Sequence, residues 1–382
     1  MKKIWACYAS VIYTLVLSFA VSAIAQTLPP PPPIIEEDEG IIKVESRLVI
    51  VPVSVTDGNG NPVKGLEKEN FRIRENSRNQ EIAEVSDAEK APLEIALLFD
   101  VSASTDTMFK FEQETAAKFL ADVMRPEDRA TIFTIGEFPL LVQHRNIAYR
   151  SIKTIRGIKP TKQRTAFYDT VMEAANYLDK NAPPKTRKVI IAITDGEDSN
   201  SQGVKTGMFK FDMSLNRRKK KLGVKKLRQA RLRNRNAIRT REQSITLKRL
   251  QDADAVFYSV NPAGSSYKLN KISKFGQDNM QRFADETGGT AFLPKFLPID
   301  LKSNYNNSAN LKKNTQTLER IFKQLTNELQ AQYLVQYYSD GEYPIGKFIK
   351  VGVKTTLNLP QGVRIRSRQG YFVKKQQSNE QK

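Results

Sequence analysis

The sequence predicts an α/β protein with a doubly wound, mostly parallel sheet flanked by helices, and a small accessory β module from the N- and C-terminal flanks. Three observations lead to this fold class. Apolar strands alternate with amphipathic helices over residues 92–330, the pattern of βαβ units. Aspartates stand directly at the ends of two of these strands. The flanking segments show the two-residue alternation of half-buried strands instead.

The N-terminus has the features of a secretory signal peptide. Two lysines precede an uncharged apolar run from Ile4 to Ala25, which ends with small residues at Ala23 and Ala25. We therefore expect residues 1–25 to be a signal peptide and the protein to be secreted or periplasmic. An uncleaved membrane anchor is the alternative, because about 20 apolar residues can cross a bilayer. The single cysteine, Cys7, lies in this segment, so the mature chain is expected to have no disulfides.

The next segments are a linker and a β region. Residues 26–40 contain a proline run followed by acids, which favours an extended, solvated linker. Residues 41–91 carry a valine at every second position from Val49 to Val55 and contain the turn sequence "DGNGNP", so they are expected to form short strands.

The C-terminal segment returns to a strand pattern over residues 331–374, before a tail at 375–382. Arginines at 364, 366 and 368 alternate with Val363 and Ile365, which predicts one wet and one buried face. We hypothesise that these strands pair with those of residues 41–91.

The central part, residues 92–330, carries the mostly parallel sheet. The apolar strands "IALLF", "VIIAI" and "AVFYSV" fit central positions in it, and helical segments such as "TAFYDTVMEAANYLDKN" separate them.

Two of these strands end in aspartate, Asp100 and Asp195. Ligands of open α/β sheets bind at the carboxyl ends of the strands. Carboxylates and hydroxyls gathered there, without cysteine or histidine, indicate a hard cation with oxygen ligands. The only histidine, His144, is expected to be structural.

The motifs "DVSAS", "QRTAFYDT" and "AITDGEDSNS" follow one another as in the von Willebrand factor type A (VWA) domain, a Rossmann-like fold that this chain resembles. The resemblance implies a metal-ion-dependent adhesion site for Mg²⁺, or for Mn²⁺ or Ca²⁺. By resemblance, its ligands are Asp100, Ser102, Ser104, Thr165 and Asp195. The flanks "VPVSVTDGNGNPVKGL" and "VRIRSRQGYFV" resemble those of a secreted bacterial subfamily that is common in acidobacteria.

This resemblance implies a binding module, not an enzyme. A partner protein would supply an Asp or Glu carboxylate to complete the metal. Two alternatives stay open: the serines and Thr105 could cap the following helix, or the metal could activate water against a phosphate ester. In "GEDSNS", Asp198 and Ser199 are expected to form a turn rather than to bind the metal.

A basic insertion interrupts the central part at residues 205–250. Between Lys205 and Arg249 it contains 17 Lys or Arg residues and only two acids. The net charge of this segment, +15, is most of the +20 of the whole chain. We expect a solvated basic helix, broken or kinked near Gly223.

The insertion suggests a contact with anionic lipid or polymer, which would make the chain an envelope-tethering protein. The absence of aromatic residues from Leu215 to Leu250 argues against dedicated nucleic-acid binding. The alternative is that the insertion is a disordered or solvated segment with no specific partner. The candidate contact residues are Arg217, Arg218, Lys219, Lys220, Lys221, Lys225, Lys226, Arg228, Arg231, Arg233 and Arg235.

Overall fold

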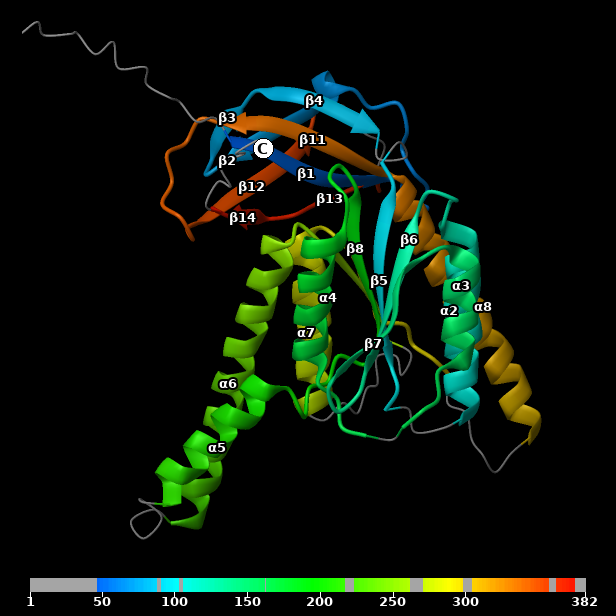
Figure 1. The fold of residues 1–382 in the computed structure, drawn as a ribbon, viewed down its shortest axis with the longest axis vertical. Helices are drawn as coiled ribbons and strands as arrows, with labels where there is room; N and C mark the ends of the chain where they lie inside the picture. Colours follow the sequence, from blue (N-terminus) through cyan, green and yellow to red (C-terminus); the bar gives the residue numbers. More distant parts are fainter. Residues whose placement is uncertain are drawn as a thin grey trace, which may run out of the picture. The chain divides into compact units, whose positions relative to one another are not determined.

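The structure is a computed structural model that describes residues 47–87, 91–102, 106–161, 163–216, 223–261, 271–297, 304–356 and 362–374 (Figure 1). The predicted signal peptide, linker and tail lie outside these residues. Within the described ranges, no helix is both long and apolar enough to cross a membrane.

Six strands form the central sheet, in the order β10-β9-β8-β5-β6-β7. Only β7 runs antiparallel to its neighbour; the other pairs are parallel. This confirms the predicted α/β class with a mostly parallel sheet. The strands are β5 (Leu93–Asp100), β6 (Arg129–Ile135), β7 (Pro139–Asn146), β8 (Arg187–Ile193), β9 (Val256–Val260) and β10 (Ala291–Phe292).

Helices cover both faces of this sheet (Figure 1). All eight residues of β5 are buried: Ile95 and Leu97 belong to one core cluster, and Ala96 and Leu98 to the other. The continuous apolar run of this strand is therefore explained by burial on two sides. One layer holds α2 (Asp106–Val123), α3 (Ala148–Gly157) and α8 (Asn304–Gln330), and the other α4 (Phe167–Asn181), α6 (Val224–Asp252) and α7 (Lys271–Thr287).

Two four-stranded antiparallel sheets, β13-β1-β11-β4 and β14-β12-β2-β3, make up the accessory β module. Strands from the two ends of the chain pair directly, with Val51 opposite Val335 and Ile73 opposite Val353. The hypothesis that both flanks build one module is confirmed. Its elements are β1 (Arg47–Thr56), the short 3-10 helix η1 (Lys68–Asn70), β2 (Phe71–Glu75), β3 (Arg78–Gln80), β4 (Ile82–Asp87), β11 (Gln332–Ser339), β12 (Phe348–Thr355), β13 (Arg364–Ser367) and β14 (Gly370–Phe372).

Polar side chains join the β module to the central sheet. Arg187 of β8 donates from Nη1 to Oε1 of Gln332 on β11 at 3.3 Å, and Arg366 of β13 donates to the Gly289 carbonyl at 3.3 Å. The predicted wet arginine face is wrong at Arg368, which is only 7% exposed because its guanidinium turns inward to pair with Asp254 at 2.7 Å.

The basic insertion forms two helices, α5 (Gln202–Asn216) and α6. Gly223 caps the start of α6, which confirms the predicted break there. Gly207 lets the two helices approach closely, because a side chain at this position would lie 3.0 Å from Ile238. The prediction of a solvated helix is wrong for the last turns of α6, where Thr246 and Leu250 are fully buried against the central sheet.

Candidate functional site

The candidate site lies at the carboxyl edge of the central sheet. Asp100 ends β5, and the parallel register sets Phe99 of β5 opposite Ile193 of β8. Thr194 and Asp195 therefore leave β8 beside the loop that follows Asp100. Asp100 and Asp195 are brought to one edge because parallel strands end on the same side.

Asp100 is the centre of a hydrogen-bond network. Its Oδ1 accepts from the Ser102 backbone N–H at 2.9 Å and from Ser102 Oγ at 2.6 Å. Its Oδ2 accepts from Thr194 Oγ1 at 2.6 Å. The carboxylate is thus fixed by both loops. Ser102 Oγ thus donates to Asp100, whereas Ser104 and Thr105, which the capping alternative also names, lie outside the described residues.

Thr165 is held by the loop that follows Asp195. Its Oγ1 donates to the Glu197 carbonyl at 2.9 Å, and its backbone N–H donates to Ser199 Oγ at 3.2 Å. The Thr165 carbonyl accepts in return from the backbone N–H groups of Ser199 and Asn200. Thr165 and Asp195 therefore sit on two loops that are fastened together.

A glycine fixes the Asp195 loop against helix α7. Gly196 has a φ of +73°, and a Cβ there would lie 2.4 Å from the Gly276 carbonyl oxygen. A side chain at Gly196 would therefore displace the loop. Asp195 Oδ1 accepts the Glu197 N–H at 2.9 Å, which keeps the turn tight.

Burial and, after it, repulsion between neighbouring carboxylates raise the pKa values of the acids at this site. Burial raises the pKa of Asp100, against its three hydrogen bonds. Burial and the neighbouring Asp100 raise the pKa of Asp195 to about 7. Burial, Asp100 and Asp195 raise the pKa of Glu112, on α2, to about 8. A bound cation would relieve this repulsion.

The donors present fit a hard divalent cation. The hydroxyl protons of Ser102 and Thr165 are given to Asp100 and to the Glu197 carbonyl, so lone pairs of both hydroxyl oxygens are left for a metal. No three His, Cys, Asp or Glu side chains of the described residues come together closely enough to hold a metal. The site thus depends on hydroxyl ligands, and Ser104 lies outside the described residues.

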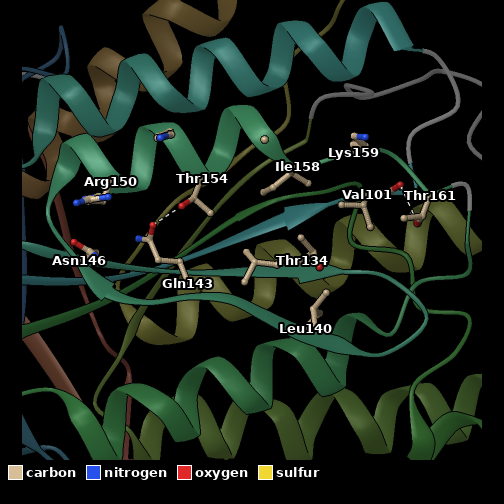
Figure 2. A pocket seen from close by; sticks show the side chains of 13 residues that line it. Val101, Thr134, Leu140, Gln143, Asn146, Arg150, Thr154, Ile158, Lys159 and Thr161 are labelled. Carbon is tan, nitrogen blue, oxygen red and sulfur yellow. Dashed lines mark hydrogen bonds between the residues drawn. The ribbon is translucent and has the colours of Figure 1, made fainter.

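A groove adjoins the site between β7 and α3, with a volume of about 670 Å³. Figure 2 shows Val101, next to Asp100, at one end of this groove, beside Thr161. The Thr161 N–H donates to the Val101 carbonyl at 2.7 Å, which ties the groove to the Asp100 loop. Exposed cationic side chains line it, namely Arg150, Lys153 and Lys159.

Sequence reasoning missed two residues of the site. Glu112 is 8% exposed and lies on the buried face of α2, between Phe109 and Ala116. A glutamate at core spacing in "MFKFEQETAAKF" was the signal that could have found it. Thr194, fully buried next to Asp195, was overlooked because strand-end threonines are common in sheets.

The structure also describes two neighbouring residues for which a structural role is predicted. Asp198 is 3% exposed and accepts from the Tyr168 and Ser201 backbone N–H groups, so its carboxylate holds the loop after β8 to the start of α4. His144 lies with Nδ1 3.1 Å from the Tyr177 hydroxyl, as expected for a structural histidine.

The candidate anion-contact residues are only partly described, because residues 217–222 lie outside the structure's described ranges. Arg231 pairs with Asp212 across α5 and α6 at 3.5 Å. Arg235 is half-buried, whereas the other described candidates, Lys225, Lys226, Arg228, Arg231 and Arg233, are exposed. Arg239, further along α6, is 7% exposed and donates to the Asp198 carbonyl at 3.2 Å. It therefore supports the loop that follows β8 and does not face solvent.

The fold and the site define a doubly wound α/β protein with a polar loop cluster at the carboxyl edge of its sheet. No family model and no curated protein matches the sequence. Among solved structures, it is similar to proximal thread matrix protein 1 from the mussel byssus with a zinc-occupied MIDAS motif (11% identity, TM-score 0.39, 65% of this chain and 48% of that chain).

A second similar structure is an aerotolerance-related membrane protein from Bacteroides fragilis (13% identity, TM-score 0.32, 60% of this chain and 99% of that chain). The chain spans about half the length of the mussel protein that it matches. The strand order and the loop geometry, not these distant likenesses, define the fold class of this protein.

Proposed function

We propose that the protein is a metal-dependent adhesion or protein-binding module of the VWA kind. Asp100, Ser102, Ser104, Thr165 and Asp195 would hold a divalent cation, with Mg²⁺ favoured over Mn²⁺ and Ca²⁺ because the donor set is small and partly neutral. The observation that carries the proposal is geometric: Asp100 and Asp195 leave neighbouring parallel strands at one edge of the sheet, and Ser102 and Thr165 donate their hydroxyl protons so that lone pairs are left for a metal. The raised pKa values of Asp100 and Asp195 support it. The bound cation would supply a positive charge that a carboxylate of a partner protein completes.

The groove of Figure 2 supports an acidic partner. Arg150, Lys153 and Lys159 line the groove, which has Val101 at one end, so a ligand that places one carboxylate at the metal could lay further acids along these cations. A location outside the cytoplasm, and membership of the secreted bacterial subfamily, remain proposals that rest on the sequence.

The partner chemistry can be tested with a displayed peptide library. We expect panning on the magnesium-loaded protein, with elution by EDTA, to select peptides that share an Asp or Glu. Changing this acid to its amide should abolish binding, measured by fluorescence polarisation, whereas changing a neighbouring residue should not. Bound peptides that EDTA does not release, or eluted peptides that share no acid, would contradict the proposed function.

A second function, attachment to an anionic lipid surface, is favoured by one observation on the α5–α6 pair. Apolar side chains are exposed beside its cations: Phe209 is 67%, Met213 51% and Val224 84% exposed. Phe209 and Met213 are four residues apart and so share one face of α5. Cations flanking exposed apolar side chains are typical of interfacial helices and favour lipid over a purely charged polymer.

We expect the triple change Lys225→Glu, Lys226→Glu, Arg228→Glu to weaken binding to phosphatidylglycerol vesicles about a hundredfold, since each surface cation contributes about 1 kcal/mol. Vesicle co-sedimentation measures this. The matched control is Lys312→Glu, Lys313→Glu, Lys323→Glu on the exposed face of α8, with the same change of charge. Equal losses in both triples would reject the lipid role, and a Phe209→Ser protein that binds vesicles normally would point to a polymer.

A further inference from the structure

A second cavity, of about 420 Å³, lies at the opposite edge of the central sheet from the metal site. It is lined by residues at the amino ends of β8 and β9, by β1 and β11 of the β module, and by the C-terminal segment that ends at Lys374. Its size is within the range of pockets that bind small organic ligands. The proposed metal function makes no use of this cavity.

The lining is strongly cationic. Six basic side chains and one carboxylate, Asp254, surround the cavity, and the basic residues are Arg47, Lys185, Arg187, Lys188, Arg368 and Lys374. Asp254 is shared between Arg368 at 2.7 Å and Lys374 at 3.2 Å. Burial would raise the pKa of Asp254, but these two cations hold it below its usual value. Lys188 also pairs with Asp179, outside the lining, at 3.7 Å, and Asp179 is shared with Arg249. The six cations therefore still exceed the carboxylates that they face.

Arg368 is the most buried of these cations. It is 7% exposed, and its Nε is buried without a hydrogen-bond partner among the described residues. Lys188 is also half-buried, and burial lowers its pKa. A buried guanidinium N–H that lacks an acceptor is costly, so the charge of Arg368 is only partly compensated by its surroundings.

The other part of the lining is apolar. Leu48 and Ile50 of β1 are 46% and 40% exposed, although they alternate with the fully buried or nearly buried Val49 and Val51. Both face this cavity, together with Leu334. These aliphatic side chains lie on one face of β1 and line a concave pocket that also carries charge. They are suited to contact the hydrocarbon part of a ligand.

We propose that this cavity binds an amphipathic organic anion, with a carboxylate, sulfonate or phosphate at Lys188, Arg368 and Lys374, and a hydrocarbon or aromatic body against Leu48 and Ile50. The cations account for the charge of the ligand, and the strand face accounts for its apolar body. Binding relieves the mutual repulsion of the cations and gives them a charge-assisted acceptor.

The test uses a fluorescent pair on the full chain. Anilinonaphthalene sulfonate carries the anion and the apolar body, and N-phenylnaphthylamine is its uncharged counterpart. We expect the sulfonate to bind at one site per chain, at least tenfold more tightly than the neutral probe. Decanoate and decyl phosphate should displace it, and the more effective of the two identifies the head group, whereas inorganic phosphate at equal concentration should not.

Variants separate the two halves of the cavity. Lys188→Met should weaken sulfonate binding at least fivefold and leave the neutral probe unchanged, and Leu48→Ser should weaken both probes. Lys350→Met, an exposed lysine of β12 outside the cavity, is the matched control and should change neither. Circular dichroism checks that each variant is folded. Equal affinities of the two probes, or equal effects of Lys188→Met and Lys350→Met, would overturn the proposal.

Discussion

Replacing Asp100 by alanine is expected to abolish divalent-cation binding and to leave the protein folded. Asp100 accepts from Ser102 and Thr194 and so fixes both loops of the candidate site. Its loss removes a proposed ligand and the link between the loops. The freed hydroxyls cost about 1–3 kcal/mol. Removing a buried carboxylate whose pKa is raised offsets part of this cost.

The measurement is a calorimetric titration of Mg²⁺ and Mn²⁺ into chelator-stripped protein. The parent chain should bind one ion, and Asp100→Ala should bind at least a hundredfold more weakly, because a metal ligand matters at least as much as its supporting partners. The matched control is Asp122→Ala, an exposed acid on α2 with the same charge change, which should bind normally. Binding by Asp100→Ala equal to the parent would remove the candidate site from the proposal.

Asp195→Asn is expected to stabilise the metal-free protein, whereas Asp100→Ala at the same site is expected to cost stability. Asp195 accepts one described hydrogen bond, from the Glu197 N–H, and is repelled by Asp100. The amide can keep that bond and carries no charge. The metal-free variant should therefore unfold at a higher temperature than the parent while metal binding is lost, a combination expected at functional sites.

The sequence was sufficient for the fold class because the strongest signals were local. The apolar run of β5, ending at Asp100, predicted both a central strand and a strand-end site, and β5 is buried on both faces as that pattern requires. The pairing of the two chain ends was predicted as a hypothesis from matching alternation, and β1 with β11 confirms it.

Features set by tertiary contacts were not predicted. Arg368 follows the wet alternation of β13, yet the junction with the central domain buries it against Asp254. The basic composition of α6 suggested solvent, yet Thr246 and Leu250 are core residues. Glu112 reads as one more helical acid until the fold places it near Asp100 and Asp195. In each case a residue distant in sequence decides the environment.

Glu112 leads to the second large effect, a stability that falls as the pH rises. Its pKa in the folded chain is raised to about 8 from the ordinary 4.5 by burial, Asp100 and Asp195. The folded protein therefore keeps a proton that the unfolded chain releases near pH 4.5. The stabilising contribution is complete below that pH and is lost as the pH rises through 8.

We expect Glu112 alone to remove on the order of 4 kcal/mol of unfolding free energy from the metal-free protein between pH 5 and pH 8.5, at about 1.4 kcal/mol per pKa unit. Urea denaturation at fixed salt measures it. Glu112→Gln should make the profile shallower, because the amide stays neutral at every pH, while Asp195 and Asp100, whose pKa values are also raised, keep their part of the slope. Glu114 is an exposed acid two residues after Glu112 on α2, where it pairs with Arg156. Glu114→Gln is the control and should leave the slope of unfolding free energy against pH unchanged.

Saturating Mg²⁺ should reverse the trend. A cation at the carboxylates lowers the cost of ionising Glu112, and an ion at a hundred times its Kd adds about 2.7 kcal/mol to the folded state. The stabilisation by metal should therefore be largest at alkaline pH and small at pH 5, where protons already neutralise the site. A metal-free stability that rises from pH 5 to pH 8.5 would contradict the charge balance on which the proposed cation site rests. If Mg²⁺ stabilised the protein equally at both pH values, its binding would be placed away from these carboxylates.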